Sequence, residues 1–226
     1  MTARLLVLAK APVPGRVKTR LCPPCTPAQA ARIAAAALAD TLDAATGTAA
    51  GTVLALDGRM AAPDGVTVLM QRGDSLGRRI AAAFADATSG VRGPVLQIGM
   101  DTPQVSPAEL DAGMDALLTP GVDAVLGPAI DGGWCALGLH EPTHAGLLAD
   151  VPMSTPDTGR LTLRALRGAG LRVAALPALR DVDTYADAVA VAELAPHGRF
   201  AATVADLRAG LGAGVAGVAG VPGVAG

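Results

Sequence analysis

The sequence predicts one α/β domain with a mostly parallel central sheet flanked by helices, and two patterns carry this prediction. Short apolar runs alternate along the chain with longer segments that begin with helix start signals. The apolar runs are nearly continuous in Val, Leu, Ile and Ala, which is typical of strands covered on both faces. At 226 residues, the chain is long enough to bury one sizeable core.

Seven apolar runs are expected to form the strands. They are residues 5–9, 52–56, 66–70, 94–98, 124–127, 134–139 and 172–176. Thr26 and Ser106 each precede a proline, which combines an N-cap with Pro at the first helical position. Glu109 completes a capping box with Ser106, and Thr184 is expected to cap a further helix. The expected helices are 27–43, one beginning after Ser106, 76–87, 159–168, 185–194 and 200–207.

Composition limits the classes of function and the location. The net charge of −2 gives no electrostatic footprint for nucleic acid, and no apolar run approaches the ~20 residues of a membrane span. The first strand follows Met1 almost directly, so we expect no signal peptide and a cytoplasmic protein. One domain is expected over residues 1–208, and the Gly-, Ala- and Val-rich residues 209–226 are expected to form a mobile tail. Oligomeric state is left open.

The three cysteines are too few for a disulfide framework. Cys22 and Cys25 form a CxxC just ahead of a helix, where a thiolate would have a lowered pKa. A redox pair or half of a zinc site is possible in principle, but no second CxxC or His pair completes a metal site. Two ordinary loop thiols remain the favoured interpretation.

The loop after the first predicted strand carries four cations, and the first acidic residue in the chain is Asp40. Ordinary basic turns usually have acids interspersed, whereas a loop of backbone N–H groups and unpaired cations suits phosphate. The motif GxxxxGK[ST] is absent, so this is not a P-loop. The alternative is a solvated basic turn. The residues expected to contact phosphate are Lys10, Ala11, Pro12, Gly15, Arg16, Lys18 and Arg20.

Carboxylates follow two other predicted strands. Asp101 comes after 94–98 and is followed by Pro103, which suits either a divalent cation or a plain turn cap. Asp181 and Asp183 lie between a strand and a helix, where either could be a second metal ligand or an acid favoured by the helix dipole. Because ligands bind outside the carboxyl ends of strands in open α/β sheets, these acids and the basic loop are expected to share one site.

Three weaker features surround this site. The junction before the helix at 76–87 contains Gln71, Gly73, Arg78 and Arg79, and we assign nucleotide contacts to Gln71, Gly73 and Arg78. The segment Asp131, Gly132, Gly133 and Trp134 predicts a tight hairpin turn whose glycines would let a ligand approach and whose tryptophan could wall a pocket. Ser154 and Thr155 offer hydroxyl groups near the acceptor end of the site. GxSxG occurs once, at residues 73–77, and GxGxxG occurs once, at residues 212–217 in the expected tail. No Ser-His-Asp arrangement accompanies the first and no predicted strand precedes the second, so nucleophilic hydrolysis and Rossmann-type dinucleotide binding have no support.

Five ordered motifs together resemble a bacterial family of GT-A-like transferases commonly labelled arsenosugar-pathway glycosyltransferases. The motifs are AKAPVPGRVKTRL, GMDTP, GPAIDGGWCALGL, MST and LRDVDT. That family is related to the molybdenum cofactor and 2-phospholactate guanylyltransferases, so the resemblance implies a nucleotide-diphosphosugar-transferase fold. Three positions depart from the family pattern: Ile130 replaces an acid, Met153 an aromatic residue and Tyr185 a proline.

The resemblance implies roles for particular residues. The loop from Lys10 to Arg20 is similar to the family's phosphate-binding loop, with Lys18, Arg20 and Asp101 as the catalytic groups. Asp101 and Asp183 resemble the metal-binding carboxylates for Mg²⁺ or Mn²⁺. Residues 131–134, with Ser154 and Thr155, resemble the acceptor site.

The expected activity is Mg²⁺-dependent nucleotidyl transfer. A nucleoside triphosphate would lie against the basic loop, and a small phosphorylated or oxyanion acceptor would attack its α-phosphorus and release pyrophosphate. Such chemistry needs positioning and charge neutralisation rather than a protein nucleophile. The alternative is a glycosyltransferase that uses a nucleotide sugar. The four cations of the opening loop and the single acid after the middle strand favour nucleotidyl transfer. A non-catalytic nucleotide-binding protein is the third possibility.

Overall fold

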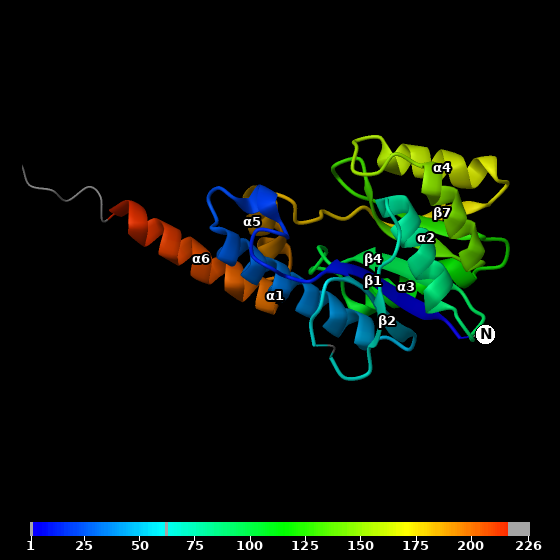
Figure 1. The fold of residues 1–226 in the computed structure, drawn as a ribbon, viewed down its shortest axis with the longest axis horizontal. Helices are drawn as coiled ribbons and strands as arrows, with labels where there is room; N and C mark the ends of the chain where they lie inside the picture. Colours follow the sequence, from blue (N-terminus) through cyan, green and yellow to red (C-terminus); the bar gives the residue numbers. More distant parts are fainter. Residues whose placement is uncertain (1, 62, 217–226) are drawn as a thin grey trace, which may run out of the picture.

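A computed structural model of the chain describes residues 2–61 and 63–216. The alternation of strands and helices predicted from the sequence is confirmed (Figure 1). The strands are β1 (Arg4–Lys10), β2 (Gly51–Asp57), β3 (Thr67–Met70), β4 (Val95–Gly99), β5 (Ala124–Pro128), β6 (Trp134–Leu139) and β7 (Val173–Ala175). The helices are α1 (Pro27–Thr46), α2 (Leu76–Ala87), α3 (Pro107–Leu118), α4 (Thr158–Gly168), α5 (Tyr185–Leu194) and α6 (Arg199–Ala216). Two 3₁₀ segments, η1 (Thr19–Leu21) and η2 (Pro142–Asp150), were not anticipated.

The strands form one seven-stranded sheet in the order β3-β2-β1-β4-β6-β5-β7. The pairs β1–β2, β1–β4, β2–β3 and β5–β7 are parallel, and only β6 runs antiparallel to its neighbours β4 and β5. The predicted mostly parallel sheet is therefore confirmed. The expectation that every strand is covered on both faces is wrong for β3, whose residues are mostly exposed because β3 is an edge strand.

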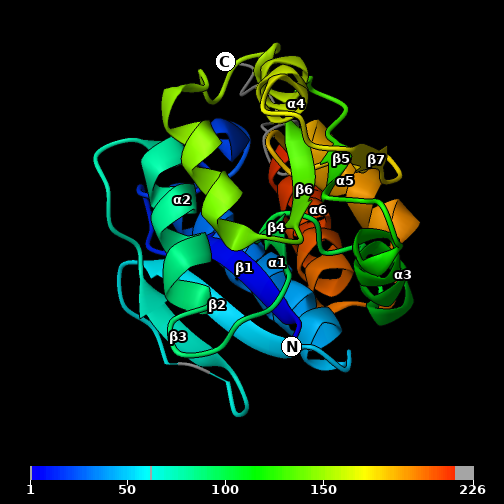
Figure 2. The same ribbon diagram turned by 90° about the vertical axis from the view of Figure 1, so that its right-hand side faces the viewer.

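Helices cover both faces of the sheet, and each face has its own apolar cluster (Figure 2). On one face, α1 and α3 pack on β1, β2 and β4 through residues such as Leu38, Leu54 and Leu96. On the other face, α2, η2 and α4 pack on β1, β2, β5 and β6 around Phe84 and Leu148. This three-layer arrangement leaves the ends of the strands open for a site.

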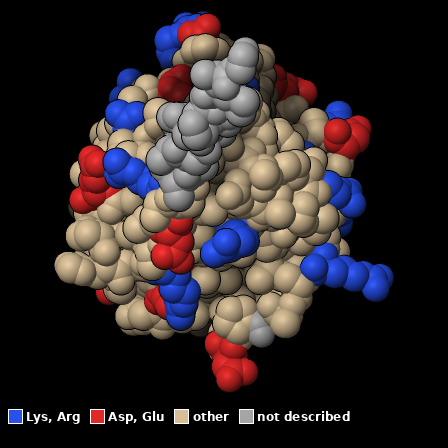
Figure 3. All heavy atoms as spheres, turned by 90° about the vertical axis from the view of Figure 1, so that its left-hand side faces the viewer, with Lys and Arg blue, Asp and Glu red and all other residues tan. Residues whose placement is uncertain are grey.

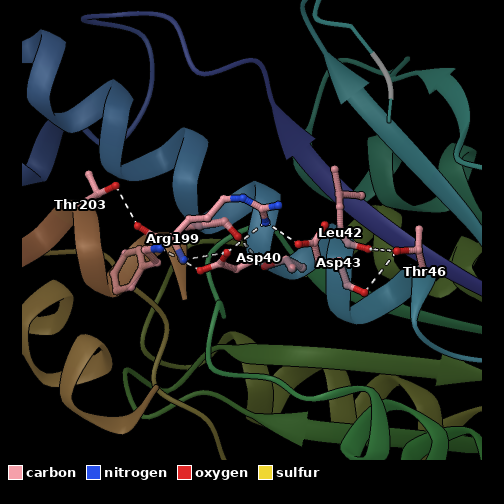
Figure 4. Close-up of polar contacts among 9 residues, drawn as sticks. Asp40, Leu42, Asp43, Thr46, Arg199 and Thr203 are labelled. Atoms are coloured by element: carbon pink, nitrogen blue, oxygen red, sulfur yellow. Dashed lines mark hydrogen bonds and ion pairs between the residues drawn. The ribbon is translucent and has the colours of Figure 1, made fainter. Parts of the chain in front are cut away.

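The remaining helices, α5 and α6, do not lie on the sheet but pack against the far side of α1, as Figure 1 shows. The start of α6 is fixed by Asp40 of α1, which accepts from the backbone N–H of Arg199 at 3.1 Å and of Phe200 at 2.8 Å. The guanidinium of Arg199 also pairs with Asp40 and Asp43 (Figure 4). Carboxylate oxygens satisfy the free N–H groups at a helix N-terminus, so Asp40 caps α6 from another helix.

The predicted helix starts are confirmed. Thr26, Ser106 and Thr184 each cap a helix, and each forms a capping box with the residue three positions later. The helix expected at 200–207 extends further, because α6 reaches Ala216 and so includes the first eight residues assigned to the tail. Residues 217–226 lie outside the described residues, and the division of the chain at residue 208 stays a prediction.

Positive and negative side chains are interspersed, with much neutral surface between them, on the face seen from the α6 end (Figure 3). Within the described ranges, no helix combines the length and apolar character needed to span a bilayer.

Candidate active site

A cleft of about 370 Å³ opens where the strand connections diverge at the centre of the sheet. β1 lies between β2 on one side and β4 on the other, and all three run in the same direction. Ligands of open α/β sheets bind beyond the carboxyl ends of the strands at such a switch point. The cleft is lined by the last residues of β1, by Gly99 at the end of β4 and by the loops that follow each strand.

The loop after β1 brings its four cations, Lys10, Arg16, Lys18 and Arg20, to this cleft. The N–H of Lys10 donates to Met100 Sδ at 3.3 Å, which joins the loop to the residues after β4. Of the other residues assigned to phosphate, Ala11 lines an adjoining pocket of about 190 Å³, whereas Pro12 and Gly15 line neither space. Because Lys10 and Arg16 line both spaces, the cationic surface continues from one to the other.

Lys18 is the most enclosed of these cations. Its backbone is left-handed, with φ 47°, and its side chain is 11% exposed. Nζ donates to Asp101 Oδ2 at 2.8 Å. Burial alone would lower the pKa of Lys18, but the charge and the hydrogen bond of Asp101 outweigh it and raise that pKa. Lys18 therefore stays protonated beside Asp101.

Gly99 leaves room for the present position of the Asp101 carboxylate, which a larger residue at 99 would displace. A Cβ at Gly99 would lie 2.4 Å from Asp101 Oδ1, well inside van der Waals contact. The carbonyl of Asp101 accepts from the N–H of Val182 at 2.9 Å, which brings the segment before α5 alongside the loop after β4. This anchor places Asp181 and Asp183 near Asp101.

The two aspartates on this segment have different surroundings. Asp183 lines the cleft and forms an ion pair with Arg20. Asp181 lines a second, adjoining pocket together with Asp101. Burial, followed by the nearby charges of Asp101 and Asp131, raises the pKa of Asp181 to about 6. The spacing alone left both aspartates open as metal ligands, because both lie in one short loop, and the resemblance selected Asp183.

The carboxylates of the cleft are suited to a hard divalent cation. Mg²⁺ needs only one or two protein carboxylates when phosphate oxygens and water complete its octahedron. Asp101 and Asp183 line the same cleft as the cations, so this pair supplies the donor type that Mg²⁺ and Mn²⁺ prefer. Within residues 2–61 and 63–216, no three His, Cys, Asp or Glu side chains form a group that could hold a metal.

The junction between β3 and α2 brings only some of the residues assigned to the nucleotide to the cleft. Gln71 lines the cleft, but its Nε2 already donates hydrogen bonds to the backbone carbonyls of Ala9 at 2.8 Å and Ala55 at 3.0 Å. Gly73 and Arg78 do not line the cleft, and Arg78 points to the surface and pairs with Asp74. Arg79 lines it instead, from the next position on α2. Adjacent helix residues point about 100° apart, so only one of two neighbouring arginines can face the cleft.

Replacing Arg79 with alanine should weaken nucleotide binding about tenfold, the loss expected for one charge-assisted hydrogen bond. Arg79 is 26% exposed, pairs with Asp57 at 3.3 Å, and its buried Nε has no partner among the described residues. Arg78→Ala is the matched control and should leave the affinity unchanged. Isothermal titration of both variants with a nucleoside triphosphate checks this, and equal losses would contradict the assignment.

The residues assigned to the acceptor form the second pocket, of about 240 Å³, which shares Leu8, Leu76, Gly99 and Asp101 with the cleft. Asp131, Gly133, Trp134, Ser154 and Thr155 line it. Gly132 does not line it but packs the turn against the residues before α4, since a Cβ there would lie 2.1 Å from Pro156 O. The turn connects β5 to β6, so the predicted hairpin is confirmed.

The cysteines do not extend the site. Cys25 is buried and Cys22 half-buried, both as free thiols, and burial raises the pKa of Cys25. Cys135 lines the second pocket, but burial raises its pKa to about 11. A thiol with so high a pKa is protonated at neutral pH and is a poor nucleophile.

Residues 28–155 match the family described as "Uncharacterized protein conserved in bacteria (DUF2064)". This stretch contains Asp101, the turn at 131–134, Ser154 and Thr155, but neither the basic loop nor Asp183. No curated protein matches the chain.

Solved structures share the fold over nearly the whole chain. A "putative nucleotide-diphospho-sugar transferase" from Desulfovibrio desulfuricans G20 is 26% identical, with a TM-score of 0.81 over 92% of this chain and 95% of that chain. Rv0371c from Mycobacterium tuberculosis H37Rv, in a complex with manganese, is 24% identical with a TM-score of 0.55 over 85% of this chain and 99% of that chain. CMP:2-keto-3-deoxy-manno-octonic acid synthetase, complexed with CTP, is 14% identical with a TM-score of 0.56 over 87% of this chain and 99% of that chain. The chain therefore has the fold of nucleotide-diphospho-sugar transferases and nucleotidyltransferases.

Proposed function

This chain belongs to the DUF2064 family, and we propose that it is a metal-dependent nucleotidyltransferase that uses a nucleoside triphosphate and releases pyrophosphate. The observation that carries the proposal is the convergence of five cations on one cleft at the switch point of the sheet. They are Lys10, Arg16, Lys18, Arg20 and Arg79. A triphosphate carries about four negative charges, and a cleft of this charge stabilises both the bound chain and the departing pyrophosphate.

The residues of the cleft take distinct roles. Lys18, protonated and fixed by Asp101, donates to a phosphate oxygen near the reacting phosphorus. Arg20 on η1 and Arg79 on α2 hold the rest of the phosphate chain. A Mg²⁺ or Mn²⁺ ion held by Asp101 and Asp183 would neutralise charge on the phosphate oxygens. The manganese in Rv0371c and the CTP in the synthetase support a divalent ion and a triphosphate in this fold.

A glycosyltransferase that uses a nucleotide sugar is the second candidate. The description of the Desulfovibrio relative, the most similar of the three structures above, favours it. The same cleft would then hold a diphosphate, and the bond broken would lie between the sugar and the β-phosphate. Five cations line the cleft, although Lys18, Arg20 and Arg79 are paired with aspartates. This positive lining favours a triphosphate over a diphosphate, so nucleotidyl transfer remains the leading proposal.

Thermal unfolding against a nucleotide panel separates the two candidates. The panel contains the four ribonucleoside triphosphates and the UDP-, GDP- and dTDP-sugars, each with and without Mg²⁺. A ligand at about 100 times its Kd stabilises the folded state by about 2.7 kcal/mol, which raises Tm by roughly 5–10 °C for a chain of this size. We expect a Mg²⁺-dependent rise with one triphosphate. A rise with nucleotide sugars alone would identify a glycosyltransferase, and no rise with any nucleotide would refute both.

A further inference from the structure

The second pocket differs in charge from the cleft beside it. The two spaces meet at Gly99 and Asp101, so a molecule in the second pocket would lie next to a nucleotide in the cleft. Asp101, Asp131 and Asp181 all line this pocket, and its lining contains no Lys, Arg or His. The cleft, in contrast, is lined by five cations. Because Asp101 is paired with Lys18, the negative charge that a molecule meets in the second pocket comes mainly from Asp131 and Asp181.

Asp101, Asp131 and Asp181 come from different segments but line the same pocket. Asp101 lies on the loop after β4, Asp131 on the turn between β5 and β6, and Asp181 before α5. Asp131 Oδ1 accepts from the N–H of Gly133 at 2.8 Å, which fixes this carboxylate at the turn. Like charges gathered in a partly buried space repel a further anion and attract hydrogen-bond donors.

A buried amide gives an independent indication of the ligand. Gln97 on β4 is 2% exposed and lines the same pocket. Its Oε1 is buried and has no hydrogen-bond partner within the described part of the chain. Buried polar groups without a partner are uncommon, and a hydroxyl-bearing ligand at this wall can both donate to and accept from a side-chain amide.

The other walls suit a sugar-like molecule. The indole of Trp134 is held in place by a hydrogen bond from Nε1 to Thr162 Oγ1 at 3.1 Å. An aromatic wall offers an apolar surface to the C–H face of a ring. Ser154 and Thr155 add hydroxyl groups that both donate and accept. A volume of about 240 Å³ equals roughly eight water molecules at ~30 Å³ each, which is enough for a molecule of monosaccharide size.

We infer that this pocket binds the acceptor and that the acceptor is an uncharged, hydroxyl-bearing molecule of monosaccharide size. This inference rests on the proposed transferase function. It departs from the phosphorylated or oxyanion acceptor expected from the sequence, because no Lys, Arg or His side chain is among the residues that line the pocket. The acceptor hydroxyl oxygen forms a bond to the α-phosphorus, the bond from that phosphorus to pyrophosphate breaks, and the hydroxyl proton passes to a neighbouring carboxylate or to water.

The test separates acceptors by charge. Small molecules from a bacterial extract are divided on an anion-exchange column, and each fraction is incubated with the full chain and the labelled nucleotide selected by the melting panel. We expect labelled product only with the unretained fraction, and the active molecule should pass a cation-exchange column unretained as well, which separates uncharged molecules from cations. Product only with the retained anions, or with neither fraction, would overturn the inference. A nucleotide-dependent rise in Tm in the same preparation shows that the nucleotide site is intact, so failure of the proposed function is recognised separately.

Variants then connect the acceptor to this pocket. With the active uncharged fraction, Asp131→Asn and Asp181→Asn should each raise the KM for the acceptor about tenfold and leave the KM for the nucleotide unchanged. Asp111→Asn, on the exposed side of α3, removes the same charge at a distance and should change neither constant. An unchanged acceptor KM in both pocket variants would overturn the inference.

Discussion

Replacement of Lys18 with alanine should weaken nucleotide binding about 100-fold and abolish transfer. Lys18 is the most buried cation of the cleft, and its Nζ lies 2.8 Å from Asp101. Loss of a hydrogen bond between charged groups costs about 1.5–3 kcal/mol, and the free Asp101 carboxylate adds repulsion toward phosphate. Isothermal titration with the selected triphosphate measures the affinity, and far-UV circular dichroism verifies that the variant folds. An affinity within twofold of the native value would contradict the assignment of the loop to phosphate.

Replacement of Asp101, the ion-pair partner of Lys18, should have the opposite effect on the affinity for the nucleotide. Asp101→Asn removes a negative charge from the phosphate site, so metal-free nucleotide binding should be maintained or strengthened. Transfer should still be lost, because Asp101 is one of the two proposed metal ligands. A purely structural role for the Lys18–Asp101 pair predicts equal losses of binding in both variants, which distinguishes the two explanations.

Replacement of Gly132 with alanine should produce the largest loss of stability among these substitutions. Gly132 has φ +92°, and a Cβ there would lie 2.1 Å from the backbone oxygen of Pro156. Left-handed strain costs about 1–2 kcal/mol and the displaced backbone about 1–3 kcal/mol more. A fall in Tm of roughly 5–15 °C is expected for a chain of this length. Calorimetry gives the shift directly.

Gly170→Ala is the control for this variant. Gly170 has φ +84°, but no atom lies within 4 Å of its Cβ position. It should therefore show the cost of left-handed strain alone, about 1–2 kcal/mol. Equal shifts in Tm for both variants would contradict the close packing of the 131–134 turn against Pro156. Because the turn borders the acceptor pocket, Gly132→Ala should also slow transfer without weakening nucleotide binding.

The fold could be predicted almost completely from local patterns. Each predicted strand was found within two residues at either end, and the caps at Thr26, Ser106 and Thr184 were correct. Strands were predicted from hydrophobic runs, and helix starts from side chains that form hydrogen bonds with the backbone of the same helix. Both patterns involve residues close together in the sequence. The segment η2 was missed because it has no amphipathic pattern of its own and is fixed by packing against α2.

The site could be predicted only where chain order determines position. The basic loop and Asp101 follow adjacent parallel strands, so their meeting was foreseeable. The choice between Arg78 and Arg79 depends on the rotation of α2 relative to the sheet, which the sequence does not encode locally. Gln97 is a single polar residue in an otherwise apolar strand, and this interruption was the one sequence signal that could have placed it in the site. The residues at 131–134, 154 and 155 of the second pocket were assigned from the resemblance, but its three carboxylates lie on three segments far apart in the chain, so their meeting had no sequence signature.

The most direct test of this account is a crystal structure of the full chain with the selected triphosphate and Mn²⁺. Data collected at the manganese absorption edge locate the metal independently of the nucleotide. We expect phosphate oxygens within hydrogen-bonding distance of Lys18, Arg20 and Arg79, and the manganese peak beside Asp101. A triphosphate bound away from these cations, or a manganese peak without Asp101 as a ligand, would contradict the central claim.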